Sequence, residues 1–113
     1  MTSTEEADKL CEEATADVAV GDLEKAAVKY RAAVSAASDH FEAWHGLGMA
    51  LLKLGHLKEA IGAGLMATTL RPNDLLAWTA LSQMYVKGGQ IAEAEAAKAN
   101  ARILSLGGRI VKE

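Results

Sequence analysis

The chain has 113 residues, of which 50% are hydrophobic, 4% aromatic and 24% charged, and its formal net charge at pH 7 is -3. So mild a charge argues against a dedicated nucleic-acid protein, which would show a basic stripe. The single cysteine, Cys11, rules out an internal disulfide, and no apolar run approaches the roughly 18 residues that a membrane-spanning helix needs.

Two helices are predicted at the start of the chain. The first runs from about residue 4 to residue 20, because Ser3 begins a capping box and Gly21 suits a left-handed end of a helix. Asp22 is an N-cap residue for the second helix, which ends near residue 36.

The middle of the chain predicts two more helices. Asp39 begins the third helix and Gly55 ends it. The fourth runs from about residue 57 to residue 70 and stops before Pro72, the only proline of the chain.

The last part of the chain predicts a fifth helix over about residues 75–87 and a sixth over about residues 91–106. The pair Gly88-Gly89 between them indicates a turn. Six helices without a strand pattern give an all-α fold class.

Gly62 and Gly64 are unexpected inside the fourth helix, because each interior glycine costs about 1 kcal/mol of helix propensity relative to alanine. One interpretation is that they make space for a large neighbour such as Trp44 or Trp78. The alternative is a hinge.

A 34-residue repeat accounts for most of the sequence. Residues 41–74 recur as residues 75–108 and, more faintly, as residues 7–40, and such a period indicates stacked units. The identities between the second and third units are Ala43/Ala77, Trp44/Trp78, Leu47/Leu81, Lys53/Lys87, Gly55/Gly89, Glu59/Glu93, Ala60/Ala94, Ala63/Ala97, Ala67/Ala101 and Leu70/Leu104.

The residues that carry a recognisable pattern in the middle unit are Trp44, Leu47, Gly48, Leu51, Ala60, Ala67 and Pro72. In type and spacing they resemble the tetratricopeptide repeat (TPR) family. The third unit departs from the pattern at Ser82, and the first has Leu10 at the place of the tryptophan.

The resemblance implies a right-handed α-solenoid of antiparallel helix pairs, the TPR superhelix. It implies a single domain over residues 1–113, with repeats at residues 7–40, 41–74 and 75–108 and a short tail at residues 109–113.

In TPR proteins the first helix of each repeat lines a concave groove that binds a peptide or a helix. The residues that the resemblance places in this groove are Cys11, Thr15, Val18, His45, Met49, Leu52, Thr79, Gln83 and Val86. The alternative is that several of them pack between the repeats.

One TPR subfamily holds the carboxylate end of chaperone tails with basic and amide side chains. The matching positions here are Cys11, Thr15, Gly46, Leu76 and Ala80. Because none of these side chains binds a carboxylate as arginine does, we expect an apolar or mixed ligand instead.

Catalysis and metal binding have little support in the sequence. Cys11 and His45 would supply at most two of the four ligands of a zinc site, and the spacing alone leaves a Cys/His nucleophile pair open. We expect no cofactor, no metal and no enzymatic activity. His40 and His56 are expected at helix boundaries in solvent.

The sixth helix has no following repeat, so we expect an apolar stripe on it to remain partly open and to allow self-association. The residues of this stripe are Ile91, Ala92, Ala96, Ala99 and Ile103.

Charge is also unevenly distributed along the chain. Residues 1–40 carry nine acidic and four basic residues, a net charge of -5, whereas residues 75–113 carry three and five, a net charge of +2. This polarity favours head-to-tail contacts between copies; the alternative is a solvated acidic face at the N-terminal end.

The leading hypothesis is a non-catalytic adaptor that binds a protein or peptide in the groove. The alternatives are an assembly element that binds or stabilises a filament and a secretion-type TPR chaperone. We expect no nucleic-acid or membrane partner. A cytoplasmic location is expected because the N-terminus lacks the basic and apolar parts of a signal peptide.

Overall fold

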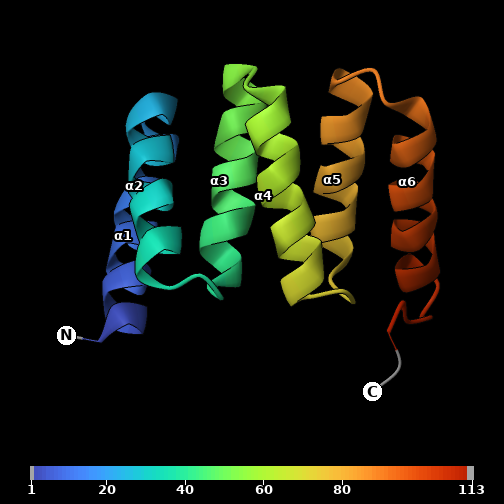
Figure 1. The fold of residues 1–113 in the computed structure, drawn as a ribbon, viewed down its shortest axis with the longest axis horizontal. Coiled ribbons are helices and arrows are strands. Elements are labelled where there is room, and N and C mark those ends of the chain that lie inside the picture. The colour runs from blue at the N-terminus through green and yellow to red at the C-terminus, as the bar shows by residue number, and fades with distance from the viewer. Residues whose placement is uncertain (1, 112–113) are drawn as a thin grey trace.

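The computed structural model describes residues 2–111; residue 1 and residues 112–113, the end of the predicted tail, lie outside the described residues. Its helices follow one another as antiparallel pairs (Figure 1). The helices are α1 (Ser3–Ala19), α2 (Leu23–Ala36), α3 (Phe41–Leu54), α4 (Leu57–Leu70), α5 (Leu75–Lys87) and α6 (Ile91–Ser105). Over the described residues, the predicted all-α solenoid of six helices is therefore confirmed.

The N-terminal ends of two helices differ from the prediction. Thr2, rather than Ser3, is the N-cap of α1, and its side chain accepts a hydrogen bond from the backbone N–H of Glu5. His40, rather than Asp39, is the N-cap of α3. A ring nitrogen with a free lone pair accepts the backbone N–H that a carboxylate or hydroxyl usually takes at this place.

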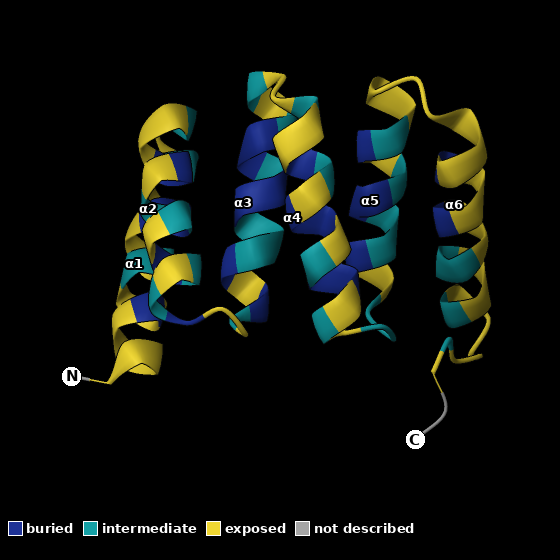
Figure 2. Cartoon of the chain, viewed as in Figure 1, coloured by how far each residue is buried: buried dark blue, intermediate teal, exposed yellow. Residues whose placement is uncertain are grey.

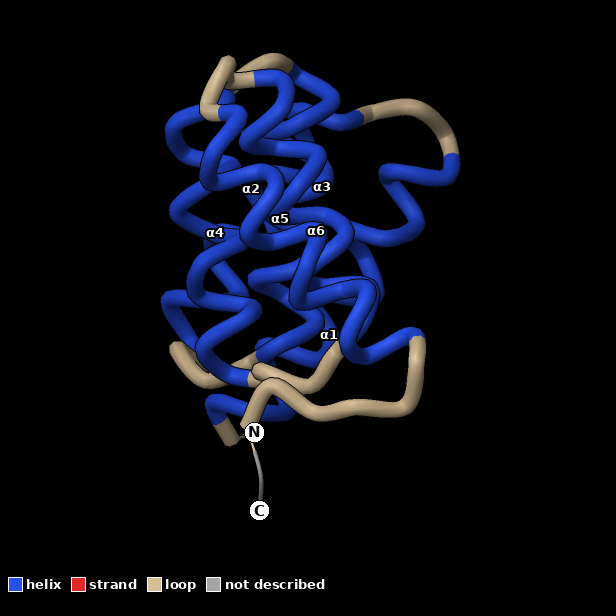
Figure 3. Tube along the Cα trace, turned by 90° about the vertical axis from the view of Figure 1, so that its right-hand side faces the viewer, coloured by secondary structure: helices blue, strands red, loops and turns tan. Residues whose placement is uncertain are grey.

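The helices form two layers along a curved stack. The odd-numbered helices contact each other in sequence, α1 with α3 and α3 with α5. Among the described residues, no Cα atom of α2 lies within 8 Å of a Cα atom of α4, and the same holds for α4 and α6. The stack therefore curves toward the odd helices, and these line its inner face. Figure 3 shows the stack from its α6 end.

The core lies between the layers and is built largely from small side chains. Ala26, Ala60 and Ala94, which are 34 residues apart, are all buried on the even helices. Leu51, Leu81 and Met84 are the largest fully buried side chains of the main core. Alanine lets helix backbones approach closely. The buried residues form a band through α3, α4 and α5 (Figure 2).

Each tryptophan of the repeat closes the loop in front of its own helix. The indole N–H of Trp44 donates to the carbonyl of Ser38 at 2.8 Å, and that of Trp78 donates to the carbonyl of Pro72 at 2.7 Å. The two tryptophans are 34 residues apart, and so are the two residues whose carbonyls they contact. One interpretation of the sequence places Trp44 or Trp78 in the space beside Gly64. Neither tryptophan fills that space.

The space beside Gly64 belongs to Met84 and Leu81 of α5. A Cβ atom at position 64 would lie 2.8 Å from the Met84 sulfur and 3.1 Å from a Leu81 methyl group. The glycine therefore does make room for a large neighbour. At Gly62, by contrast, a Cβ atom would have no neighbour within 4 Å among the described residues, and nothing in the structure explains this glycine.

The tail after α6 folds back onto the loop between α4 and α5. The Asn73 side-chain oxygen accepts the backbone N–H groups of Ile110 and Val111 at 2.8 and 3.0 Å, and its amide donates to the Val111 carbonyl at 2.8 Å. The tail is thus held by three hydrogen bonds to one side chain.

Candidate functional site

The inner face of the stack carries the predicted groove residues, but most of them are only partly accessible. Cys11, Val18, Met49 and Leu52 pack against the edge of the main core. Thr15, Gln83 and Val86 are exposed. The apolar residues of α1 and α3 therefore pack between repeats, as the alternative interpretation has it, while other positions face outward. A role of these positions in partner binding stays a prediction.

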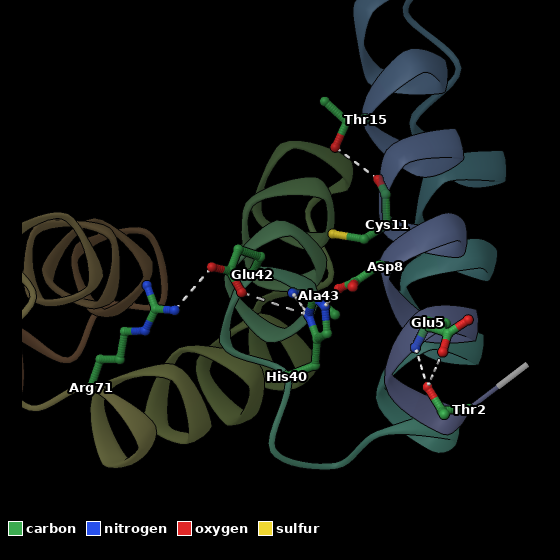
Figure 4. Close-up of polar contacts among 9 residues, drawn as sticks. All are labelled: Thr2, Glu5, Asp8, Cys11, Thr15, His40, Glu42, Ala43 and Arg71. Carbon is green, nitrogen blue, oxygen red and sulfur yellow. Dashed lines mark hydrogen bonds and ion pairs between the residues drawn. The ribbon is translucent and has the colours of Figure 1, made fainter.

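A hollow of about 530 Å³ lies at the α1 end of the inner face, where α1 meets α3. Its lining residues are Asp8, Cys11, Glu12, Thr15, His40 and Glu42. Figure 4 shows several of these side chains converging from the two helices. Two predicted groove residues, Cys11 and Thr15, are thus joined by three carboxylates that the sequence analysis did not single out.

His40 fixes one wall of this hollow. Its Nδ1 atom accepts the backbone N–H of Ala43 at 3.1 Å, and its Nε2 atom lies 2.6 Å from a carboxylate oxygen of Asp8 (Figure 4). This pair of contacts requires the neutral tautomer that carries its proton on Nε2. The side chain is only 9% exposed, so the expectation that His40 lies in solvent is wrong; His56 is exposed, as predicted.

The Cys11 thiol is a poor nucleophile in this setting. Burial raises its pKa, and the carboxylates of Glu42, Asp8 and Glu12 raise it further because they disfavour a second negative charge. Because the thiolate is the reactive form, a raised pKa lowers reactivity at neutral pH.

Glu42 keeps its negative charge in the hollow. Its pKa is lowered by a hydrogen bond from its own backbone N–H and by the nearby Arg71 guanidinium, which lies 2.9 Å away. Arg71 also lies 4.3 Å from the centre of the Phe41 ring, a cation–π contact. The electrostatic character of the hollow is therefore acidic.

His45, a predicted groove residue, is engaged within its own helix. Its ring stacks on Phe41 with 5.8 Å between centroids and an interplanar angle of 9°. Among the described residues, no group of three or more His, Cys, Asp or Glu side chains is arranged to hold a metal ion.

Thr15 connects the inner face to the second helix of its repeat. Its hydroxyl donates to the carbonyl of Cys11 at 2.9 Å and lies 2.9 Å from the Tyr30 hydroxyl, from which it can accept. The Tyr30 ring is 5% exposed and lies against Gly46 of α3, where a Cβ atom would be 2.5 Å from two ring carbons. A side chain at position 46 would therefore have to displace the Tyr30 ring.

A second hollow of about 370 Å³ lies at the other end, where α5 meets α6. Its lining residues are Thr79, Ser82, Gln83, Val86, Lys87, Glu95, Lys98 and Ala101. The three predicted groove residues of the third repeat thus share one depression. Val86 is 55% exposed, so an apolar contact is available there.

The inner face changes character along its length. Leu76 is 68% exposed and occupies the position in the third repeat that Glu42 has in the second. Ala80, another of the positions compared with the carboxylate-binding subfamily, is buried. The face is thus acidic at its α1 end and apolar at its α5 end.

The five residues predicted as an apolar stripe on α6 are all exposed. Ile91 and Ile103 are 58% and 44% exposed. Their exposure agrees with the prediction of an open stripe, and self-association through the stripe stays a prediction. No helix of the described chain has both the length and the apolar composition required to cross a bilayer.

Comparison with known families gives one match. The model described as tetratricopeptide repeat matches residues 41–74, the middle unit. None of the curated proteins compared with the sequence matches it.

Several solved structures share the fold. The second TPR of Spaghetti (RPAP3), bound to the HSP90 peptide SRMEEVD, is 19% identical with a TM-score of 0.85, over 89% of this chain and 94% of that one. The Yersinia enterocolitica type III secretion translocator chaperone SycD is 19% identical with a TM-score of 0.83, over 90% and 77%. MamA from AMB-1 is 28% identical with a TM-score of 0.81, over 86% of this chain but only 53% of MamA.

Proposed function

This chain is a tetratricopeptide repeat protein, and on that premise we propose that it is a non-catalytic adaptor whose inner face binds an extended peptide or a helix of a partner protein. The observation that carries the proposal is the pair of hollows of about 530 and 370 Å³ at the two ends of that face. Rigid helices hold both hollows in fixed positions, so the ordering cost on binding falls mainly on the ligand.

The charges of the face favour a partner segment that is not acidic. Asp8, Glu12 and Glu42 would repel a carboxylate at the α1 end, whereas Leu76 and Val86 offer apolar contact at the α5 end. The ligand we propose is therefore a mixed segment, with apolar side chains toward α5. It differs in charge from the acidic peptide bound to the Spaghetti domain.

The test begins with retention of proteins from a source-cell lysate on the immobilised chain. Each retained protein is then purified, and its affinity is measured by calorimetry for the wild type and for two inner-face variants, Gln83→Arg and Met49→Arg with Gln83→Arg. We expect the affinity to fall at least about tenfold in both variants, because the arginine side chain would obstruct the inner face and reduce its apolar contacts with the ligand.

Val28→Arg and Leu65→Arg are the matched controls, since both side chains are exposed on even helices at 62% and 45%. Circular dichroism checks that every variant retains its helix content. Equal affinity of wild type and inner-face variants, or a loss only in the controls, would contradict the proposal.

A further inference from the structure

Each inner junction of the array places one residue of an even helix against the next odd helix. At the first junction Tyr30 lies against Gly46. At the second, Gly64 lies against Leu81 and Met84. Tyr30 and Gly64 are 34 residues apart, so they are the same position of the repeat. The next residue in this series is Lys98 on α6.

The same series can be followed back to α1, the first helix of the stack. The positions of Gly46, Leu81 and Met84 correspond in the first repeat to Glu12, Glu13 and Ala16. All three of these residues are exposed. One end of the array thus presents Lys98 on α6, and the other presents Glu12 and Glu13 on α1. The equivalent repeat positions face each other at the junctions inside the array.

We propose that a second copy of this chain docks end to end, with its α1 placed on α6 where a further odd helix would lie, and with Lys98 facing Glu12 and Glu13 of the next copy. The proposal goes beyond the adaptor function, because it concerns the ends of the stack. Opposite charges at one register fix the alignment of such a contact.

The space for the docked helix is present on α6. A hollow of about 400 Å³, lined by Glu95, Lys98, Ala99, Arg102 and Ile103, adjoins the hollow of about 370 Å³, which also includes Glu95 and Lys98. Lys98 and Glu95 occupy the repeat positions of Gly64 and Ile61, which contact α5 and its C-terminal end inside the array.

Docking would also cover an exposed apolar residue. Ile61 lies 3.5 Å from where a Cβ atom of Gly88 would be, and the position of Gly88 in the first repeat is Val20. Val20 is 79% exposed. It would meet the aliphatic part of Glu95 in the neighbouring copy.

The geometry defines the kind of assembly. The two contacting surfaces are different, so the contact is heterologous and adds copies in an open series rather than closing into a symmetric dimer. Because the contact depends on exposed charges, we expect it to be weak at physiological salt and weaker still as the ionic strength rises.

A charge exchange between the two ends tests the proposal by sedimentation velocity over a range of protein and salt concentrations. We expect wild type to form a concentration-dependent series of species at low salt. Lys98→Glu alone, and Glu12→Lys with Glu13→Lys, should each weaken the association at least about tenfold, since both create like charges across the contact. An equimolar mixture of the two variants should associate again, because each end then meets an opposite charge.

Two controls separate this contact from other surfaces. Lys58→Glu makes the same charge change on α4, away from both ends, and should associate as wild type does. Ala96→Glu alters the exposed stripe of α6 without lining either hollow and should also leave the series intact. A strictly monomeric wild type, an unchanged Lys98→Glu variant, or a mixture that fails to associate although both variants keep their helix content would overturn the proposal.

Discussion

The two inner junctions of this array solve the same packing problem in opposite ways. At the first, the large side chain lies on the even helix, where Tyr30 covers Gly46. At the second, the large side chain lies on the odd helix, where Met84 lies beside Gly64. In both cases a glycine receives a bulky neighbour, but the direction is reversed.

This reversal specifies the order of the repeats. If α2 were followed by α5, Tyr30 would take the position of Gly64, and its ring would compete with Leu81 and Met84 for the same space, with Ala80 in place of Gly46. If α4 were followed by α3, Gly64 would meet Gly46, and a void would remain. Close-packed interiors tolerate neither outcome without a loss of stability, so the volumes at two positions favour one sequence of repeats.

The largest expected effect comes from removing the large side chain of the second junction. Met84 is 1% exposed, so Met84→Ala should lower the free energy of unfolding by about 2–5 kcal/mol, measured by urea denaturation with circular dichroism. Adding Gly64→Met to this variant would move the bulk to the even helix, as in the first junction, and should restore part of the loss. If Gly64→Met restored none of the lost stability, the large side chain could not be moved from the odd to the even helix at this junction.

A smaller loss is expected when the glycine of the first junction gains a methyl group. Gly46→Ala should cost about 1–3 kcal/mol by overpacking, because the added methyl group would lie 2.5 Å from two carbons of the buried Tyr30 ring, which must shift. Tyr30→Leu in the same chain should reduce this cost, and a double-mutant cycle of the two substitutions measures the coupling. Purely additive effects would mean that Tyr30 and Gly46 do not constrain each other.

The two glycines of α4 should respond differently to alanine. Gly62→Ala should stabilise the chain by up to about 1 kcal/mol, since helix propensity improves and nothing is displaced. Gly64→Ala should gain less or lose stability, because the Met84 thioether must shift. Thermal unfolding of the two variants side by side measures the difference, and equal gains would contradict the role given to Gly64.

The smallest effect concerns an ion pair that joins the even helices α2 and α4. Arg31 donates to both carboxylate oxygens of Glu59, at 2.7 and 2.8 Å, and this hydrogen bonding lowers the pKa of Glu59. The next two even helices, α4 and α6, have Leu65 and Glu93 at the same repeat positions, and these residues cannot form such a pair. An exposed pair of this kind contributes about 0.2–1 kcal/mol.

The pH dependence of this contribution follows from the lowered pKa of Glu59. The stabilisation is fully present above the unfolded value of about 4.3 and is lost as the pH falls through the folded pKa. Arg31→Leu should therefore lower the urea midpoint at pH 7, and its difference from wild type should shrink toward pH 3. A constant difference would assign the effect to packing of the arginine stem.

The repeat period predicted the helices well because it depends on many positions at once. The exact ends of the helices were less predictable, since His40 is a rare N-cap residue and both Thr2 and Ser3 are residue types that cap helices. His40 is equivalent in the repeat to Asp74, a regular N-cap whose side chain accepts the backbone N–H of Ala77. This equivalence was the signal in the sequence for a helix start at His40, and the choice of Asp39 overlooked it.

The candidate site was predicted only in part. The period identifies which face of a helix points inward, and Cys11 and Thr15 do line a hollow. It does not show how far the neighbouring helix extends across that face, so the carboxylates of Asp8, Glu12 and Glu42 were missed. The partner of Gly64 was also misassigned, because the tryptophans were expected in the core but close their own loops.

The pairing of Asn73 with residues 110 and 111 makes the third repeat a closed ring. Its three hydrogen bonds join chain segments 37 and 38 residues apart, with α5 and α6 between them. Few residues of α6 are buried, so by packing alone this helix would fray first. Within the ring it cannot separate fully unless the Asn73 contacts also open, and its unfolding is thereby linked to the second repeat. At the opposite end of the stack, the contact between Asp8 and His40 joins α1 to the start of α3.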